Sequence, residues 1–563
     1  MKRALSLSAC WIMYVLATTT ARSQSCNSSD ISIAWAYTFD QGNHNDIAYD
    51  VAAIDSDLDG QKDDGFVIVG TTEYSGSPKL QGFIIMIDEN GNERWRDTRG
   101  GNNMDAFNSV IQESNGKIIV CGWKTSNAKG SGASRNVWVL QYNVTGDTPV
   151  EHEYGGSGSD EGWDIIEDEE NELYVVAGRA GNVADGDLHN HTSINADGEY
   201  WVFTLDPSAF TVGWEEIYCG TYTGGTGEDW ATSIMIAADG NYVVSGFCAS
   251  CDPLKVQWDA LMLNLDPADG SVNWSGFYGY NPGFGSRDQG TYQVIETTEG
   301  DDDYFVAAGV HHPSQHANCF GDYQHDAWGL KNDDAGNDIW TPGCELSEGK
   351  NYGGKYTDNG YSLVKTCIGN YLIAGNTKSP TDSFDITCNN DATRPYTSDA
   401  WLLNLNPDGT VAWDASLGST GDDEFHSIEE LEDGTYIAVG EYYGGVSLKQ
   451  NFYAVRFAIT DCNNPKNDKD VNNRLDSICL LSVFPNPSTG VIEIVLRLSG
   501  VKDQSVTIAL SGIVGKTIFA SIGNLENGKL VESISLMSLP NGFYRLTAAV
   551  GDMIYSTKII VED

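Results

Sequence analysis

A short apolar segment that ends in glycine recurs seven times along the 563-residue chain, and this repeat constrains the fold more than any other feature. The copies span residues 66–70, 118–122, 174–178, 242–246, 304–309, 371–375 and 436–440. Their final glycines lie 52 to 68 residues apart. A period of this length is typical of the four-stranded blades of a β-propeller with room for loops.

Each repeat divides into four short predicted strands. Segment 229–234 is followed by a tight turn at 238–240 and by the strand that ends in glycine. A long loop leads to a third strand, such as 259–265 or 399–405, and a Gly turn leads to a fourth strand near a tryptophan. These tryptophans are Trp35, Trp95, Trp214, Trp274, Trp340 and Trp413. A Trp side chain has about 150–250 Å² to bury, so we expect them to join neighbouring blades.

The order of strands predicts how the ring closes. The last repeat has no tryptophan strand after residues 452–457, whereas a copy of that strand, around Trp35, precedes all the others. We therefore predict that residues 33–39 complete the seventh blade, which would hide the sheet edges of an open array. The predicted fold class is all-β, with a propeller of about seven blades over residues 32–457.

The ends and the charge of the chain bear on its compartment. Residues 1–23 run from Lys2 and Arg3 through an apolar stretch to small residues, the pattern of a secretory signal cleaved after Ser23. No other segment is long and apolar enough to predict a membrane span. The formal charge is −48, and removal of the signal with its three basic residues would make it −51. Such a charge repels phosphate backbones and anionic membranes, so we expect no nucleic-acid partner.

Eleven of the 12 cysteines lie after the predicted signal, and an oxidising compartment favours disulfides among them. Pairs that are close in sequence are Cys248 with Cys251, Cys319 with Cys344, Cys367 with Cys388, and Cys462 with Cys479. Spacing does not fix the connectivity, and the odd number leaves one cysteine free.

An acidic insertion in the first repeat predicts a calcium site. Residues 55–63 read D-x-D-x-D-G-x-x-D, and alternate acids in such a loop supply the oxygens that Ca²⁺ requires. The candidate ligands are Asp55, Asp57, Asp59, Gln61 and Asp63. The loop is similar to those of integrin-type propellers, but Phe66 stands where an EF-hand has its bidentate Glu. We expect a dissociation constant of about 10⁻⁴–10⁻³ M, and the alternative is a solvated acidic turn.

Other polar clusters have simpler explanations. An aspartate recurs at each blade entry, and it either binds a cation or sugar or caps the preceding glycine turn. Its recurrence favours the cap. The set is Asp46, Asp105, Asp160, Asp229, Asp288, Asp358 and Asp423. The histidines His311, His312, His316 and His325, near Cys319, fit no zinc spacing and indicate a disulfide-tied loop. We predict no catalytic residues, no other metal and no organic cofactor.

The last 80 or so residues follow a different pattern. A polar linker at 458–480 leads to a region without the propeller repeat. Its landmarks are Pro485, Asn486 and Pro487, then Gly542 and Tyr544, and finally Lys558. In this order they resemble the type A C-terminal sorting domain of type IX secretion. The resemblance implies a small β-sandwich over residues 481–563 that the outer-membrane translocon recognises and its sortase removes. The cargo would be secreted or anchored at the outer-membrane surface.

The repeats themselves resemble uncharacterised propeller repeats of Bacteroidota-type bacteria, which bring no activity with them. We expect a binding module for an extracellular glycan or protein. The alternatives are a carbohydrate-active enzyme and a surface scaffold. Two carboxylates with raised pKa values at the channel mouth, beside a deep cleft, would favour an enzyme, whereas aromatic side chains without convergent acids would favour binding.

Overall fold

The structure is a computed structural model, and its chain divides into two compact units, Met1–Asn463 and Asn464–Asp563. The boundary falls inside the predicted linker. The described residues are 30–39, 44–56, 58, 61–73, 79–126, 134–181, 185–188, 198–218, 228–249, 258–279, 289–299, 302–311, 325–340, 349–381, 383–387, 397–419, 421–431, 433–444, 449–460, 479–484, 491–498, 505–512, 517–525, 529–536, 539–540, 542–550 and 553–561. The predicted signal peptide lies outside them.

The first unit contains seven four-stranded antiparallel sheets, here called blades 1 to 7. Blade 1 has β2 (Asp46–Ile54), β3 (Gly65–Glu73), β4 (Leu80–Ile87) and β5 (Glu93–Arg99). Blade 2 has β6 (Asp105–Gln112), β7 (Ile118–Ser126), β8 (Ser134–Tyr142) and β9 (Val150–Tyr154). Blade 3 has β10 (Glu161–Asp168), β11 (Leu173–Ala180), β12 (Glu199–Leu205) and β13 (Val212–Tyr218), with a short 3₁₀ helix, η1 (Gly186–Leu188), between β11 and β12. Blade 4 has β14 (Trp230–Ile236), β15 (Tyr242–Cys248), β16 (Asp259–Leu265) and β17 (Val272–Tyr278).

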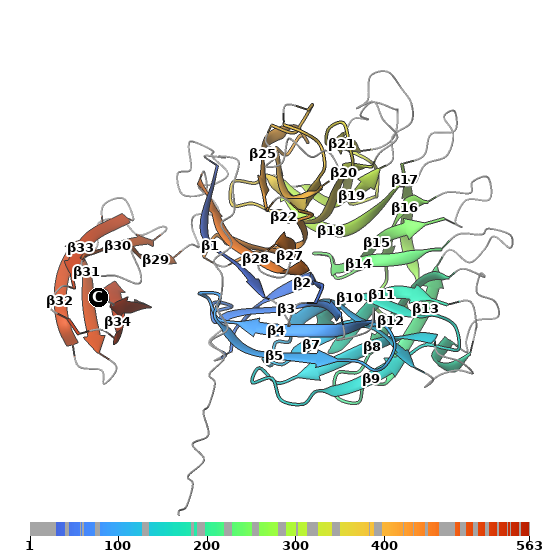
Figure 1. Ribbon diagram of the computed structural model, residues 1–563, viewed down its shortest axis with the longest axis horizontal. Helices are drawn as coiled ribbons and strands as arrows, with labels where there is room; N and C mark the ends of the chain where they lie inside the picture. Colours follow the sequence, from blue (N-terminus) through green and yellow to red (C-terminus); the bar gives the residue numbers. More distant parts are fainter. Residues whose placement is uncertain are drawn as a thin grey trace, which may run out of the picture. The chain divides into compact units, whose positions relative to one another are not determined.

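Blades 5 to 7 continue the pattern and close it. Blade 5 has β18 (Gln289–Glu299), β19 (Asp302–His311), β20 (Asp326–Asp333) and β21 (Lys350–Tyr352). Blade 6 has β22 (Asp358–Lys365), β23 (Tyr371–Thr377), β24 (Asp399–Leu405) and β25 (Val411–Leu417). Blade 7 has β26 (Glu424–Glu430), β27 (Thr435–Gly444), β28 (Lys449–Ile459) and, as its outer strand, β1 (Ile31–Phe39). The first strand of each blade lies toward the middle of the ring of sheets (Figure 1).

The expected closure of the ring is confirmed. β1 pairs antiparallel with β28 from Ile31↔Ile459 to Phe39↔Phe452, so the first described strand completes the last blade. Trp35 Nε1 then donates a 3.1 Å hydrogen bond to the backbone oxygen of Glu89 in blade 1. The N-terminal strand therefore protects the edge of β28 and connects the two ends of the repeat array.

The recurring glycine has a steric cause. In every blade it lies on the second strand, opposite the innermost strand, where a Cβ atom would come within 1.9–2.2 Å of a backbone oxygen. At Gly70 that oxygen belongs to Ile47, and at Gly440 it belongs to Glu424. Only glycine permits this close approach, which explains why the repeat is easiest to see at this position.

Tryptophans in the outer strands, and Trp340 between the third and fourth strands of blade 5, join neighbouring blades, as predicted. Trp95 Nε1 donates to Val144 O at 2.8 Å, Trp214 Nε1 to Pro267 O at 2.9 Å, and Trp340 Nε1 to Pro407 O at 3.1 Å. Each acceptor lies in the turn between the third and fourth strands of the next blade. In blade 2 the equivalent contact is made by His152, which stacks on Phe210 with ring centroids 4.5 Å apart.

The second unit contains two antiparallel sheets. One has the order β29 (Cys479–Phe484), β30 (Val491–Leu498), β33 (Lys529–Ser535). The other has the order β32 (Thr517–Asn524), β31 (Ser505–Gly512), β34 (Gly542–Val550), β35 (Met553–Val561). Inward apolar side chains such as Ile494, Ile508 and Leu546 form its core.

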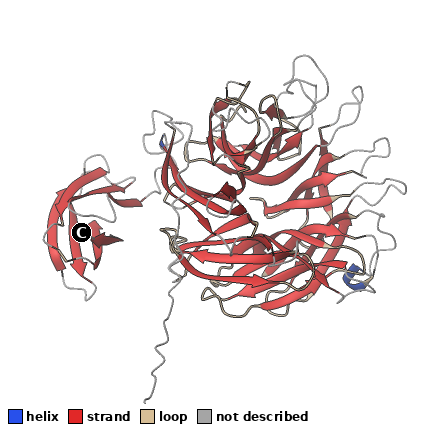
Figure 2. Cartoon of the chain, in the orientation of Figure 1, coloured by secondary structure: helices blue, strands red, loops and turns tan. Residues whose placement is uncertain are grey.

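Both units are built from strands, as Figure 2 shows. No helix in the described residues is long and apolar enough to cross a lipid bilayer.

Candidate functional site at the channel mouth

The innermost strand of every blade carries a β-bulge at the same place, next to the residue that pairs with the recurring glycine. A bulge leaves one residue unpaired and re-aims its side chain. The bulged residues in blades 1 to 7 are Tyr49, Asn108, Trp163, Thr232, Tyr292, Tyr361 and His426. These innermost strands surround the middle of the ring of sheets, here called the central channel, and the bulged residues lie on them (Figure 1).

The residue after each bulge is polar and binds the neighbouring blade. The contacts, in order around the ring, are Asp50 Oδ2 with Val110 N (2.8 Å), Ser109 Oγ with Asp164 Oδ1 (2.9 Å), Asp164 Oδ2 with Ile234 N (2.9 Å), Ser233 Oγ with Val294 N (3.3 Å), Gln293 Oε1 with Leu363 N (2.7 Å), Ser362 Oγ with Ile428 N (3.1 Å) and Ser427 Oγ with Asp50 Oδ1 (2.9 Å). We call this closed ring of seven hydrogen bonds the polar girdle. It connects all seven blades, and its role is structural.

Four of the bulged aromatic rings, together with Phe247, form a continuous arc along one side of the channel. Phe247 and Tyr292 have ring centroids 5.1 Å apart, and Tyr292 and Tyr361 are 5.0 Å apart. Tyr361 and His426 are 5.0 Å apart, and His426 and Tyr49 are 5.5 Å apart. We call these five residues the aromatic arc. It spans blades 4, 5, 6, 7 and 1, and no sequence motif had indicated it.

Two glutamates lie beside the arc on blade 7. Glu424 begins β26 and pairs directly with Glu441 of β27, two residues before the bulge at His426. Ligand atoms of these three side chains all lie within 4.8 Å of one another. Asn376 Nδ2 and Ser398 Oγ both donate to Glu424 Oε1, at 3.1 and 3.0 Å, so blade 6 holds this carboxylate in place.

The electrostatics of this corner favour neutral side chains. Burial raises the pKa of Glu441 to about 8, and the charges of Glu424 and of two nearby aspartates add to the effect. Burial also raises the pKa of Glu424, although hydrogen bonding to Ser398 opposes the shift. Burial lowers the pKa of His426 to about 4, so the imidazole is neutral at pH 7. Burial and the charge of Glu424 together raise the pKa of Tyr292 to about 12.

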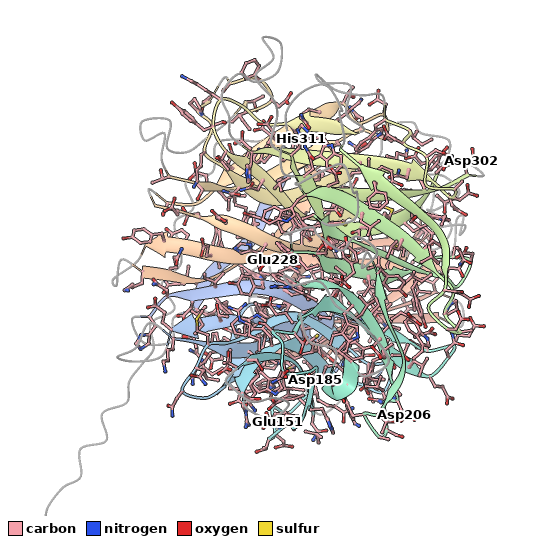
Figure 3. All side chains as sticks on the ribbon, turned by 90° about the vertical axis from the view of Figure 1, so that its right-hand side faces the viewer. Glu151, Asp185, Asp206, Glu228, Asp302 and His311 are labelled. Atoms are coloured by element: carbon pink, nitrogen blue, oxygen red, sulfur yellow. The ribbon has the colours of Figure 1, made fainter. Side chains whose placement is uncertain are left out.

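The other side of the mouth has different chemistry at the equivalent positions. In blade 3 the place of Glu424 is taken by Glu161, which forms an ion pair with Arg135, and Arg135 lies 4.0 Å over the ring of Trp123. Arg179, paired with Glu161 in the sheet, binds Glu228 at 3.0 Å, and Figure 3 labels Glu228. The acids here are neutralised by arginines. The two corners therefore differ: Glu161 forms an ion pair with Arg135, whereas Glu424 and Glu441 form none among the described residues, although the charge of Lys378 lowers the pKa of Glu424.

The recurring aspartates at the blade entries act as caps. Asp160 accepts backbone hydrogen bonds from Gly156 at 2.7 Å and from Gly181 at 2.6 Å, which fixes the turn before the blade. Asp105 and Asp358 accept the equivalent bond from the glycine four residues earlier, at 2.7 Å each. The expectation of a capping role is confirmed at these positions.

Blade 5 departs from this pattern. Asp288 lies outside the described residues, and its predicted place at the blade entry is occupied by the next residue, Gln289. Gln289 N donates to Trp258 O at 2.9 Å, as Asp160 N donates to Arg135 O at 2.9 Å in blade 3. Gln289 lies three residues before the bulge at Tyr292, as Asp160 lies three residues before Trp163, so the aspartate was predicted one residue too early in blade 5.

The predicted calcium loop is described only in part. Asp57 and Asp59 lie outside the described residues, Gln61 and Asp63 are exposed, and Asp55 is buried. The hairpin is closed by Asp64, which accepts hydrogen bonds from Ser56 N at 2.7 Å and Ser56 Oγ at 2.8 Å. Calcium binding by Asp55, Asp57, Asp59, Gln61 and Asp63 stays a prediction.

The predicted histidine cluster is described only at two of its members. His312, His316 and Cys319 lie outside the described residues. His311 is buried at the end of β19, where Nδ1 lies 3.0 Å from Asn351 Nδ2; Figure 3 labels it. Among the described residues, His311 does not join a group of metal-ligating side chains.

The cysteine predictions are tested only in part. Cys248 and Cys367 are disulfide-bonded, and their partners lie outside the described residues, so the pairings stay predictions. Cys121 is a free and buried thiol, in agreement with the odd number of cysteines.

The sorting motifs are also described in part. Pro485, Asn486 and Pro487 lie outside the described residues. Gly542 begins β34, and Tyr544 Oη donates to Pro540 O at 2.7 Å. Lys558 pairs with Arg545 in the same sheet.

Sequence reasoning missed the aromatic arc and the three residues on blade 7. Their signal is the positions one and three residues after the recurring Asp, where the repeats differ from one another. In blade 7 these positions read Glu424 and His426. The features that all blades share are structural, so the repeat does not indicate these residues.

The comparisons with known proteins identify the second unit. Residues 482–562 match the family described as "Secretion system C-terminal sorting domain". The protein is thus a type IX secretion cargo with a β-propeller, exported and either secreted or located at the outer-membrane surface. No curated protein matches the sequence.

Several solved structures show a distant likeness. A fungal alcohol oxidase in complex with copper is 12% identical, with a TM-score of 0.44 over 95% of this chain and 100% of the other. The quinohemoprotein alcohol dehydrogenase from Comamonas testosteroni is 12% identical, with a TM-score of 0.41 over 76% of each chain. The β-propeller domain of the Trilobed protease from Pyrococcus furiosus is 10% identical, with a TM-score of 0.36 over 77% of this chain and 100% of the other. Nothing about the ligand or activity of this chain follows from these likenesses.

Proposed function

We propose that this exported propeller is a glycan-binding protein. Its site is the side of the channel mouth that blades 4, 5, 6, 7 and 1 form. The observation that carries the proposal is the aromatic arc beside Glu424 and Glu441. Sugars present apolar C–H faces, which pack on aromatic rings, and hydroxyl groups, which donate to carboxylates. A concave site with apolar walls and a few polar groups is the general form of a small-ligand site.

The charges at the mouth narrow the class of glycan. Neither Glu424 nor Glu441 forms an ion pair among the described residues, although the charge of Lys378 lowers the pKa of Glu424, and the whole chain has a formal charge of −48. An anionic sugar would be repelled by this field. We therefore propose a neutral glycan or one that carries amino sugars as the ligand.

Binding is favoured over glycoside hydrolysis by the placement of the two acids. Hydrolases place two carboxyl groups on either side of the scissile bond. Glu424 and Glu441 are direct partners on adjacent strands of one blade, so they approach a ligand from the same side. Their raised pKa values meet one of the conditions for catalysis, and hydrolysis therefore remains the second candidate.

A glycan-array screen of the chain without its signal peptide tests both candidates. The screen is run with Ca²⁺ and with EDTA, and each glycan is checked for retention and for chemical change. Retention of neutral or amino glycans without product supports the proposal. Product formation would replace it with the hydrolase, and the absence of both would point to a protein partner or a scaffold.

The site is tested with Tyr361→Ala, which removes the middle ring of the arc. We expect retention to fall about fivefold, because stacking on an aromatic face contributes of the order of 1 kcal/mol. Tyr361→Phe keeps the ring and should retain most of the binding. Phe277→Ala, on the exposed outer strand of blade 4, is the surface control. Equal retention by Tyr361→Ala and Phe277→Ala would place the glycan elsewhere.

A further inference from the structure

Three side chains of blade 7 converge on one point of the channel mouth. Glu424 and His426 come from β26 and Glu441 comes from β27, and their ligand atoms lie within 4.8 Å of one another. Two adjacent hydrogen-bonded strands carry all three, so their spacing is fixed by the sheet and not by a loop. Sites built on strands are more precise than sites built on loops.

Polar atoms in this cluster lack protein partners. Glu441 is 6% exposed, and its Oε2 atom is buried without a hydrogen-bond partner in the described residues. His426 contacts the rings of Tyr49 and Tyr361, at 5.5 and 5.0 Å between centroids, and these ring contacts are its only interactions among the described residues. Leaving a buried carboxylate oxygen unpaired costs free energy of about 1–3 kcal/mol or more. A metal ion that accepts a lone pair from this oxygen would remove that cost.

Neighbouring side chains orient Glu424 and Glu441 but leave carboxylate oxygens available to a ligand. Both hydrogen bonds donated to Glu424 end on Oε1, so Oε2 remains available. Gln450 hydrogen-bonds the Glu441 carboxylate. Such outer contacts to the carboxylates are typical of metal sites, where their loss weakens binding by about 10–100-fold.

We propose that Glu424, His426 and Glu441 bind one divalent transition-metal ion of the Zn²⁺ type at the channel mouth. The imidazole favours such an ion over Ca²⁺ or Mg²⁺, which prefer oxygen ligands alone. Ligand distances of about 2.0–2.2 Å require only small rotations of side chains that already lie this close. Three protein ligands leave a coordination position open toward the channel.

The open position links the metal to the proposed glycan site. A sugar hydroxyl can occupy it in place of water, so the metal would orient the glycan against the aromatic arc. This link rests on the proposed function. Metal binding itself does not, because it needs only the three side chains of blade 7.

Neighbouring blades supply variants that fit the fold. Blade 6 carries Asn359 and Asn376 at the positions of Glu424 and Glu441, so the double variant E424N/E441N reproduces a pair that this fold already accommodates. Blades 1, 5 and 6 carry Tyr at the position of His426, so His426→Tyr is equally conservative. Glu216→Asn, on an exposed position of the outer strand β13, is the matched surface control.

The test is calorimetric titration of the full chain, without its signal peptide, with ZnCl₂ after removal of metals by EDTA and dialysis. We expect one equivalent of Zn²⁺ to bind to the native chain and to Glu216→Asn with the same affinity. E424N/E441N and His426→Tyr should each bind at least 100-fold more weakly, with unchanged melting temperatures in EDTA. Co²⁺ in place of Zn²⁺ should give a visible absorption band that both variants lack.

Two results would overturn the proposal. One is the absence of stoichiometric Zn²⁺ binding to the native chain, and the other is binding of equal affinity in E424N/E441N, which would place the ion at other acids. Because no glycan is present, these results are independent of the glycan screen. Stoichiometric Zn²⁺ binding without glycan retention would support the metal site and contradict the proposed function. Glycan retention without Zn²⁺ binding would support the proposed function and contradict the metal site.

Discussion

Asp164 and Asp50 are half-buried carboxylates of the polar girdle, and each accepts a backbone hydrogen bond from the next blade. Burial raises the pKa of Asp164 to about 7 and that of Asp50 to about 6. In the unfolded chain both titrate near 3.8, so between about pH 4 and pH 7 the folded state binds more protons. Stability contributed by these groups is therefore fully present below about pH 4 and is lost as the pH rises through the folded pKa values.

This linkage predicts the effect of Asp164→Asn. The amide keeps an acceptor for Ile234 N but cannot ionise. Between pH 5 and pH 8 the native protein should lose roughly 2–4 kcal/mol of stability that the variant keeps, given about 1.4 kcal/mol per pKa unit. Thermal melting of both proteins across this range measures the difference. Parallel pH curves for the two proteins would show that Asp164 does not ionise within this range.

The bulge position shows what sequence can and cannot predict at this scale. Gly70 and its equivalents were evident from the repeat because sterics impose the same residue on every blade. His426 was not, because its position tolerates Tyr, Asn, Trp and Thr in other blades, and only the register shows that these side chains meet in one channel. The residues that could bind a ligand therefore lie at positions where the residue type differs from blade to blade.

Among the elements, the outer strands hold the blades together by a contact that the sequence did predict. The ring of Trp95 in β5 stacks on Tyr142 of blade 2 at 5.8 Å, and its Nε1 binds Val144 O. A Cβ atom on Gly146 would lie 2.4 Å from this ring, so the turn of blade 2 fits closely around it. Each blade thus carries half of an interface that the next blade completes.

We expect Trp95→Ala to destabilise the propeller by about 2–4 kcal/mol, somewhat less than a fully buried Trp, because the side chain is half-buried. Trp95→Phe keeps the stacking and loses only the hydrogen bond, which is worth about 1 kcal/mol. Chemical denaturation of the three proteins gives the ranking. A loss in Trp95→Ala no larger than in Trp95→Phe would mean that ring packing contributes little.

The hairpin between β2 and β3 gives a second prediction at this scale. If the loop binds Ca²⁺ with a dissociation constant of about 10⁻⁴–10⁻³ M, then 10 mM Ca²⁺ should stabilise the protein by about 1.4–2.7 kcal/mol. Melting in Ca²⁺ and in EDTA measures the shift. Asp57→Asn with Asp59→Asn should abolish it, whereas E424N/E441N should keep it. A shift that survives the first pair of substitutions would assign the calcium effect to other acids.

In the whole molecule, the sorting domain and the proposed ligand site belong to separate units. The two units have separate cores, and the sorting family covers residues 482–562 only. The sequence predicted this division because the repeat stops and specific motifs begin. It could not predict which surface of the second unit is recognised, since that depends on which face of each strand packs inward.

The edge strand β32 offers such a surface. It ends its sheet, and Ile518 and Ile522 on one of its faces are 46% and 74% exposed. An exposed edge with apolar side chains is normally avoided in secreted proteins unless a partner covers it. We therefore predict that the secretion machinery contacts β32.

In the native bacterium, Ile522→Lys should lower the amount of protein delivered to the surface or medium several-fold, with retention in the periplasm. The melting temperature of the purified chain should stay unchanged. Thr507→Lys, exposed on the neighbouring strand β31, is the control for added charge. Normal delivery of Ile522→Lys would exclude β32 as the recognised edge.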